Sequence, residues 1–340
     1  MGLVYLMVIV GGLTRLTDSG LSMVDWRPLM GTIPPITESQ WIETFEQYRQ
    51  SPEYLQINKG MSLDEFKYIF YWEYGHRVLG RLLGLVFFIP FVYFLIKRRL
   101  ALPLARKLGI AFLLGGTQGL LGWYMVKSGL VDVPHVSQYR LAAHLSLAFF
   151  LLCYLYWLCL SLLFARFERQ SSKSLWWPSL ILALTISLQI VFGALTAGLD
   201  AGKMYNTFPD MNGYFLPPGS FAITPIALNF FENPVLVQWT HRTLAWAIVG
   251  IGIFLFMKGR IANTPNPGRR FHNLILAMIS LQFLLGVGTL VLNVPLAWAS
   301  LHQAGAGVLL LLAVTNLFYE ARLKFGSKAR NDLTEIPRPV

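Results

Sequence analysis

The chain has 340 residues, of which 55% are hydrophobic and only 13% are charged, and its formal net charge is +11. A soluble globular protein carries about a quarter charged residues, so this composition excludes an ordinary soluble domain and indicates a lipid-facing surface. The basic residues cluster in short loops between apolar runs, which disfavours nucleic-acid binding. Cys153 and Cys159 lie inside an apolar run, where small buried side chains are favoured over a disulfide or a thiolate metal site.

Eight apolar runs are candidates to cross a bilayer. They lie near residues 1–16, 77–96, 108–126, 141–165, 176–198, 237–257, 272–292 and 297–319. The first run begins at Met1 and is short for a full span. Ser62 and Glu65 form a capping-box pattern that predicts a helix beginning near Leu63, several turns before the second run. The sequence therefore predicts an all-α polytopic membrane protein with eight transmembrane helices.

Basic residues follow every second apolar run. Examples are Arg98, Arg169, Arg270 and Lys324 after the second, fourth, sixth and eighth runs. The positive-inside rule then predicts that both termini are cytoplasmic. The long segments 17–62 and 199–236, with the 127–140 loop, are expected on the outer side. The expected location is the bacterial inner membrane, or the mitochondrial inner membrane if the source is eukaryotic.

The two halves of the chain resemble each other. Residues 11–20 match residues 193–202 with five of ten positions identical, and Asp18 corresponds to Asp200. Four helices per repeat keep both repeats in the same orientation, which predicts a pseudo-two-fold axis along the membrane normal. We expect two pseudo-symmetric four-helix bundles over residues 1–170 and 171–325, followed by a cytoplasmic tail at 326–340.

Four of the six histidines, His76, His144, His241 and His302, are expected in the first two turns of the even-numbered spans, all at the outer end. Ionisable residues at such depth are costly and usually functional. Neutral imidazole is the commonest metal ligand, and histidines paired from neighbouring helices suit a six-coordinate haem iron better than a zinc site. A hydrogen-bonded interfacial histidine is the alternative for any single position.

The surroundings of these histidines fit a macrocycle. One turn deeper, the same helix faces carry only small residues: Gly80, Ala148, Ala245 and Ala306. Candidate contacts for haem propionates are Arg77, Arg81, Arg140 and Arg242, with ordinary interfacial snorkelling as the alternative. His135 and His272 have no counterpart in the other repeat and are left out of the site.

The halves differ in one acidic residue. Glu73 lies three residues before His76 on the same helical face, whereas no acid precedes His241 at the equivalent place. This asymmetry predicts that the first histidine pair serves chemistry and the second a structural or electron-transfer haem. A simple ion pair between Glu73 and a nearby arginine is the alternative.

At several motifs the sequence resembles haem A synthases of the mitochondrial and proteobacterial type. The motifs are Gly12 to Trp26, Glu73 to Arg77, Gln118 to Leu130, Tyr139 to His144, Asp200 to Gly202, Phe231 to Pro234, and His302 with Gln303. They follow the family order from about residue 3 to 320. Some bacterial relatives carry a cysteine pair in the first outer loop; this chain has none there.

The resemblance implies an enzyme that oxidises the C8 methyl of haem O to a formyl group, giving haem A for terminal oxidases. It implies a haem b with its iron on His241 and His302, haem O as substrate on His76 and His144, and catalysis at Glu73. Implied partners are a haem O synthase, oxidase assembly factors, an electron donor of unknown identity and the lipid bilayer, with no nucleic acid. Two alternatives remain: a quinol-linked dihaem b-type electron carrier, and a transporter suggested by the parallel repeat.

Overall fold

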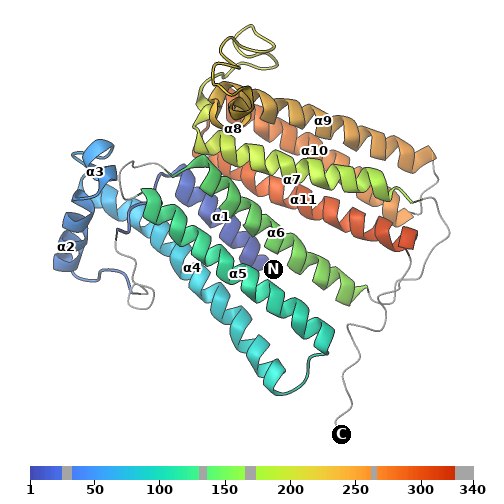
Figure 1. Ribbon diagram of the computed structural model, residues 1–340, viewed down its shortest axis with the longest axis horizontal. Helices are drawn as coiled ribbons and strands as arrows, with labels where there is room; N and C mark the ends of the chain where they lie inside the picture. The colour runs from blue at the N-terminus through green and yellow to red at the C-terminus, as the bar shows by residue number, and fades with distance from the viewer. Residues whose placement is uncertain (25–32, 130–135, 165–173, 262–265, 326–340) are drawn as a thin grey trace.

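The computed structural model describes residues 1–24, 33–129, 136–164, 174–261 and 266–325. Over these residues the chain is α-helical without a β-strand, and its long helices run side by side (Figure 1). The long helices are α1 (Gly2–Leu16), α4 (Leu63–Ile96), α5 (Leu102–Gly129), α6 (Gln138–Leu163), α7 (Trp176–Gly198), α9 (Pro234–Ile261), α10 (Asn266–Val291) and α11 (Leu296–Phe325). Between them lie the short helices α2 (Glu38–Arg49), α3 (Pro52–Gln56), η2 (Ala201–Lys203), η3 (Ile226–Leu228) and α8 (Asn229–Glu232).

Seven of the described helices are long and apolar enough to cross a membrane, from α4 to α7 and from α9 to α11. The eighth apolar helix, α1, has 15 residues. At a rise of about 1.5 Å per residue it falls short of a bilayer core of about 30 Å. The prediction of eight spans is thus confirmed for seven, and the protein is a multi-pass helical membrane protein.

The helix starts explain where the histidines lie. The predicted capping box is formed: Glu65 Oε2 accepts from the Ser62 backbone N–H at 2.8 Å, and α4 begins at Leu63. His76 therefore lies in the fourth turn of its helix, and the expectation of the first two turns was wrong for it, because α4 extends well outside the apolar region. His144, His241 and His302 do lie in the first two turns of α6, α9 and α11.

The long helices pack in two rings of four. In the first ring, α1 and α5 each pack on both α4 and α6. In the second, α7 and α10 each pack on both α9 and α11. Within the described residues, the histidine-bearing helices α4 and α6 are not close neighbours, and neither are α9 and α11. Each histidine pair therefore comes from helices that face each other across a ring.

The seam between the rings forms the main core. It is made by α6 against α7 and α11, and by α1 against α11. Val8, Phe149, Ile186 and Leu310 are buried there in one cluster. By contrast, α4 and α5 expose large apolar side chains such as Leu113, at 68% exposure. A water-facing helix would not carry such a surface, but a lipid-facing helix requires it.

Helices α1 and α11 touch next to His302. A Cβ on Gly12 would collide with the amide of Gln303, and this amide donates to the Val8 carbonyl at 2.9 Å. Nearby, the Tyr5 hydroxyl donates to the Ala304 carbonyl at 2.6 Å. Glycine at this position lets the two backbones approach, as small residues do in membrane helix packing.

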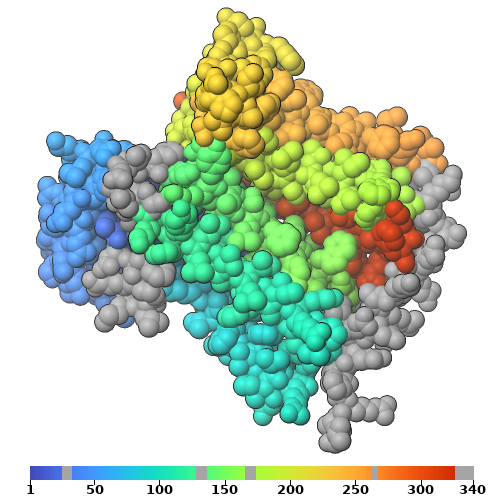
Figure 2. Space-filling model, in the orientation of Figure 1, coloured from blue at the N-terminus to red at the C-terminus, as the bar shows by residue number. Residues whose placement is uncertain are grey.

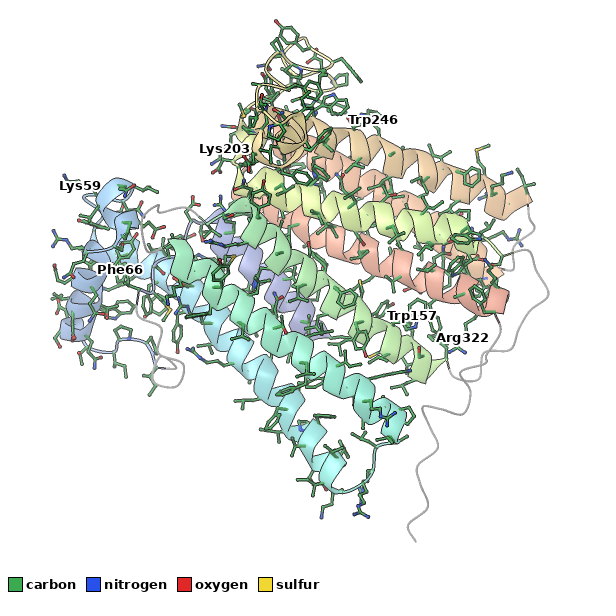
Figure 3. The ribbon with its side chains drawn as sticks, in the orientation of Figure 1. Lys59, Phe66, Trp157, Lys203, Trp246 and Arg322 are labelled. Carbon is green, nitrogen blue, oxygen red and sulfur yellow. The ribbon has the colours of Figure 1, made fainter. Side chains whose placement is uncertain are left out.

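An outer cap, defined here as residues 37–61 with α2 and α3, packs on the extended start of α4. Figure 1 shows α2 and α3 standing away from the other helices. The Tyr48 and Phe66 rings, both fully buried, stack at 4.9 Å between centroids, and Figure 3 labels Phe66 on this face of α4. Trp41 packs edge-on against Phe70 at 5.1 Å. An aromatic core of its own therefore holds the cap.

The second outer segment lies over the other ring. Residues 199–233 include η2, η3 and α8 and stand out from the helices in Figure 2. The buried side chain of Asn229 holds this segment together: its Nδ2 donates to the Ile223 carbonyl at 2.7 Å and the Ile226 carbonyl at 2.9 Å. Arg242, on α9, binds the same segment from below, as described with the site.

Inside the outer cap, Glu53 is a buried carboxyl whose protonation changes with pH. Burial raises the pKa of Glu53 from 4.5 to about 7, and the charges of Glu73 and Asp18 also raise this pKa. The hydrogen bond from Tyr48 acts in the opposite direction and lowers it. The folded cap therefore holds a proton more tightly than the unfolded chain. The resulting stabilisation is complete below pH 4.5 and is lost as the pH rises through about 7.

We therefore expect limited proteolysis of the outer cap to be faster at about pH 8 than at about pH 5. The variant Glu53→Gln keeps a neutral side chain at both pH values and is expected to remove the difference. Because the protease itself responds to pH, rates are to be normalised to an unstructured peptide substrate. Equal normalised rates for the unsubstituted protein at both pH values would contradict the prediction.

Candidate functional site

Each of the four predicted histidines packs against a glycine on a neighbouring helix. A Cβ built on that glycine would lie 2.9 to 3.2 Å from the imidazole ring in every case. The pairs are His76 with Gly11 of α1, His144 with Gly122 of α5, His241 with Gly193 of α7, and His302 with Gly286 of α10. A side chain at any of these four positions would displace the ring, so glycine here provides room for the imidazole.

Three of the imidazoles also contact a glutamine amide. Gln118 Nε2 lies 3.3 Å from both ring nitrogens of His144 and donates to the His144 carbonyl at 3.0 Å. Gln282 Nε2 makes the equivalent pair of contacts to His302, at 3.0 Å to Nδ1 and 2.6 Å to the carbonyl. Gln189 Nε2 lies 3.3 Å from His241 Nε2. These amides fix how the rings are turned.

His241 and His302 face each other. Their ring centroids are 6.4 Å apart and their planes are 80° apart. One iron bound by a nitrogen of each ring at about 2 Å would hold the centroids about 6 Å apart. His241 Nδ1 is buried and has no hydrogen-bond partner among the described residues, so a ring nitrogen is left to serve a ligand. The residues of this pair therefore fit a haem iron held between two imidazoles.

Glu73 is buried beneath the first outer segment, at 2% exposure. Its Oε2 accepts from the Ser22 hydroxyl at 2.7 Å and from the Met23 backbone N–H at 2.8 Å. Its Oε1 accepts from Arg77 one turn further on. The ion pair weighed as the alternative for Glu73 is thus present, and the carboxylate fastens residues 22–23 to α4 one turn above His76.

Two of the four predicted arginines occupy equivalent places. Arg77 Nη2 donates to the Met23 carbonyl at 3.1 Å, and Arg242 Nη2 donates to the Thr207, Pro209 and Asp210 carbonyls at 2.6 to 3.1 Å. In both guanidiniums Nη1 is buried without a partner among the described residues. Each arginine holds an outer segment with one nitrogen and leaves another for an anion.

The remaining predicted residues are placed differently. Arg140, on α6, lies over the Tyr124 ring at 4.6 Å and makes a long hydrogen bond to its hydroxyl. Arg81 is one turn deeper on α4 than Arg77. Both cysteines have free thiols and are only partly buried, where the sequence favoured buried side chains. His135 lies outside the described residues.

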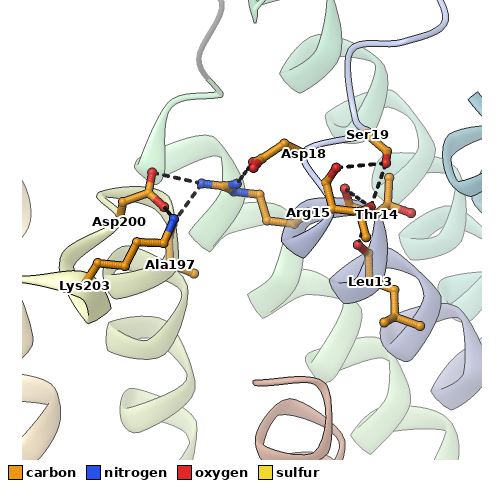
Figure 4. Close-up of polar contacts among 9 residues, drawn as sticks. Leu13, Thr14, Arg15, Asp18, Ser19, Ala197, Asp200 and Lys203 are labelled. Atoms are coloured by element: carbon orange, nitrogen blue, oxygen red, sulfur yellow. Dashed lines mark hydrogen bonds and ion pairs between the residues drawn. The ribbon is translucent and has the colours of Figure 1, made fainter. Parts of the chain in front are cut away.

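At the C-terminal ends of α1 and α7 a charged clasp joins the two rings of helices (Figure 4). Arg15 pairs with Asp18 at 2.5 Å, donates to the Ala197 carbonyl at 3.0 Å and lies 3.6 Å from Asp200. Asp18 and Asp200, matched in the sequence repeat, both adopt left-handed backbone conformations, with φ of 48° and 49°. The repeat thus extends to the way each helix ends.

His272, which the sequence left out of the site, has a neighbour that only the structure reveals. At the ends of α10 and α11 remote from the other four histidines, His272 Nε2 lies 3.9 Å from Glu320 Oε1, and both side chains are buried. Close by, Arg322 lies over the Phe318 ring, which packs against Trp157; Figure 3 labels Trp157 and Arg322 at this end. Because the cluster of His272 and Glu320 lies at the other end of the helices, it is not part of the histidine site.

The helices define a multi-pass membrane protein in which the imidazoles of His241 and His302 face each other across a ring of helices. Residues 1–314 match the model of a family described as "Cytochrome oxidase assembly protein". The chain is 49% identical to a "Heme A synthase" of Nitrosospira multiformis, over 92% of this chain and 88% of the relative. It is 48% identical to one of Parvibaculum lavamentivorans and 43% identical to one of Flavobacterium psychrophilum, over 92% and 91% of this chain and 89% and 92% of those relatives. The chain therefore belongs to the haem A synthase family of cytochrome oxidase assembly proteins.

Proposed function

We propose that this protein oxidises the C8 methyl group of haem O to a formyl group by successive hydroxylations, giving haem A for terminal oxidases. The observation that carries this proposal is identity of 40–49% over some 92% of the chain to proteins named "Heme A synthase". The four partly buried histidines support it, because haem chemistry needs imidazole ligands placed in pairs. The same relatives favour an enzyme over a dihaem electron carrier.

We assign His241 and His302 to a resident haem b and His76 and His144 to the substrate haem O. The centroid separation of 6.4 Å supports the first assignment. The second rests on the repeat, since His76 and His144 have the same glycine contacts as their counterparts. Bound haem b would supply one-electron chemistry at its iron, while the protein orients both macrocycles and excludes water.

The domain organisation is part of the proposal. We assign residues 1–170 to an N-terminal bundle on the haem O side, 171–325 to a C-terminal bundle on the haem b side, and 326–340 to a cytoplasmic tail. The two rings of helices, α1 with α4–α6 and α7 with α9–α11, support two pseudo-symmetric bundles. Close packing of α1 on α11 beside His302 supports electron passage between the bundles.

Arginines on the outer side are proposed to hold the haem propionates. Arg77 and Arg242 are the stronger candidates, because each has a buried Nη1 without a partner among the described residues. Arg81 and Arg140 are secondary candidates. A guanidinium that binds an outer segment with one nitrogen and a propionate with another would couple closure of that segment to binding of the macrocycle.

We place the protein in the bacterial inner membrane, or the mitochondrial inner membrane of a eukaryotic source, with both termini cytoplasmic and the histidine pairs near the outer face. The positive-inside pattern of the loops supports this orientation. Expected partners are a haem O synthase, oxidase assembly factors and an electron donor.

The deciding experiment is co-expression with a haem O synthase in a host that lacks haem A, followed by chromatography of the extracted haems. We expect haem A and a hydroxylated intermediate in cells carrying both proteins. Cells with the haem O synthase alone are the control and are expected to hold haem O only. Haem O without either oxidised product in cells that accumulate the intact protein would overturn the proposal.

A further inference from the structure

The neighbours of the four histidines follow one pattern with one exception. Each glycine that faces an imidazole is preceded, one turn earlier on its helix, by a long side chain. In three helices that side chain is a glutamine: Gln118 before Gly122, Gln189 before Gly193 and Gln282 before Gly286. On α1 the residue one turn before Gly11 is Met7. His76 is therefore the one member of the four whose flanking helix offers a thioether in place of an amide.

The contacts of Met7 differ from those of the glutamines. Its methyl group lies 3.2 Å from where a Cβ on Gly80 would be, one turn deeper on α4 than His76. No hydrogen bond to the His76 ring is found within the described part of the chain. The three glutamines each retain a buried Oε1 that has no partner among the same residues. It is the amide nitrogen that lies against the ring, and in Gln118 and Gln282 the same nitrogen also donates to the backbone carbonyl of the histidine, so the ring is held against its own helix.

A second partner on the ring governs how firmly an imidazole holds a metal. Outer partners that orient a ligating histidine matter for the metal, and loss of such a partner costs about 10- to 100-fold in metal affinity. A glutamine amide can hydrogen-bond both a ring nitrogen and the backbone, whereas a thioether has no N–H and its sulfur is only a weak acceptor. Among the described residues, the rings of His144, His241 and His302 therefore have a polar side chain that orients them, and the ring of His76 does not.

We infer that Gln118, Gln189 and Gln282 are positioning residues that fix three haem ligands, and that Met7 keeps His76 an exchangeable ligand. This inference rests on the proposed function. A resident haem b held by His241 and His302 has two firm ligands, as a permanent cofactor requires. A substrate haem held by His76 and His144 has one firm and one labile ligand. Its release breaks the two coordinate bonds from the iron to His76 and His144, whose electron pairs stay on the imidazole nitrogens, and no oxidant or reductant is needed.

The test exchanges the two side chains between equivalent positions. The full-length protein, purified in detergent and loaded with ferric haem b at both sites, is mixed with excess apomyoglobin, and haem transfer is followed by absorbance. We expect a fast phase from the site of His76 and a slow phase from the site of His241. Met7→Gln is expected to slow the fast phase about tenfold, and Gln189→Met to accelerate the slow phase about tenfold.

Two further variants make the result decisive. Leu6→Gln introduces the same amide on the exposed face of α1, where Leu6 is 44% exposed, and is expected to leave both phases unchanged. Gln282→Met acts on the other ligand of the resident haem and is expected to repeat the effect of Gln189→Met should that variant fail to fold. Folded Met7→Gln protein with an unchanged fast phase would overturn the inference.

The experiment distinguishes a failure of this inference from a failure of the proposed function. Release rates that change as expected in a protein that makes no haem A would refute the enzymatic activity and leave the ligand inference standing. Unchanged release rates in a protein that does make haem A would refute the ligand inference and leave the enzymatic activity standing. The low-spin absorbance of the slowly released haem gives a second readout, which is expected to shift in Gln189→Met and not in Met7→Gln.

Discussion

Alanine in place of His302 or His241 is expected to remove the haem b absorbance from the purified protein. The centroids of the two imidazoles are 6.4 Å apart, between the four helices of the second ring. Each imidazole is fixed by a glycine and a glutamine on α7 or α10. Loss of either imidazole leaves the iron with one protein ligand and opens a cavity beside it. Haem A formation is expected to fall with the absorbance, because we propose that electrons reach the substrate through the resident haem.

His272→Ala is the matched control for this prediction. His272 belongs to the same ring of helices and is buried, with 2% exposure, but it lies at the opposite end of α10 beside Glu320. Its removal is expected to lower the thermal stability and to leave the haem b spectrum in place. Full haem b content in His241→Ala or His302→Ala, measured on protein of unchanged elution volume, would sink the ligand assignment.

Glu73→Ala is expected to abolish haem A formation while the haem b absorbance persists. The carboxylate accepts two hydrogen bonds from residues 22–23 and pairs with Arg77. Removing one partner of a buried ion pair costs about 3–5 kcal/mol, since the other charge remains without compensation. The outer segment above His76 is then released, while the second ring of helices, to which we assign haem b, is untouched.

Two variants divide the roles of Glu73. Ser22→Ala removes one hydrogen bond to the carboxylate and keeps its charge, so it tests the fastening of the segment alone. Glu73→Gln keeps the shape and removes the charge. If Ser22→Ala leaves haem A formation nearly intact while Glu73→Gln abolishes it, the charge is required for the reaction. Normal haem A accumulation in Glu73→Ala would reduce Glu73 to a structural partner of Arg77.

Much of this architecture follows from local sequence patterns. The capping box at Ser62 predicts the start of α4 because both of its hydrogen bonds lie within one helical turn. The long apolar runs predict the spans because lipid permits no polar surface there. The histidines were found by their equal depth in a repeat, which needs no knowledge of helix neighbours. The position of His76 within α4 was wrong because its turn was counted from the start of the apolar run and not from the helix start at Leu63.

The contacts around the site could not be predicted without the three-dimensional fold. Short connections predict that α5 lies beside α6 and that α10 lies beside α11, but they do not fix which faces of the helices meet, so the glutamines beside the histidines were missed. A signal was present nonetheless: glutamine recurs one turn before glycine at Gln118, Gln189 and Gln282. The pairing of His272 with Glu320 gave no such signal, because the two residues are far apart in the chain and belong to different helices.

The contacts of Arg15 in the charged clasp make the two repeats structurally non-equivalent. Under perfect two-fold symmetry, a second arginine would reach from α7 back to the end of α1. The repeat instead has Ala197 at that position, and the carbonyl of this alanine is what Arg15 binds. Two copies of the first half could form the clasp twice, whereas two copies of the second half could not form it at all. The two halves are thus not interchangeable. The residue that distinguishes them, Arg15 in the first half and Ala197 in the second, also forms the hydrogen bond that joins them.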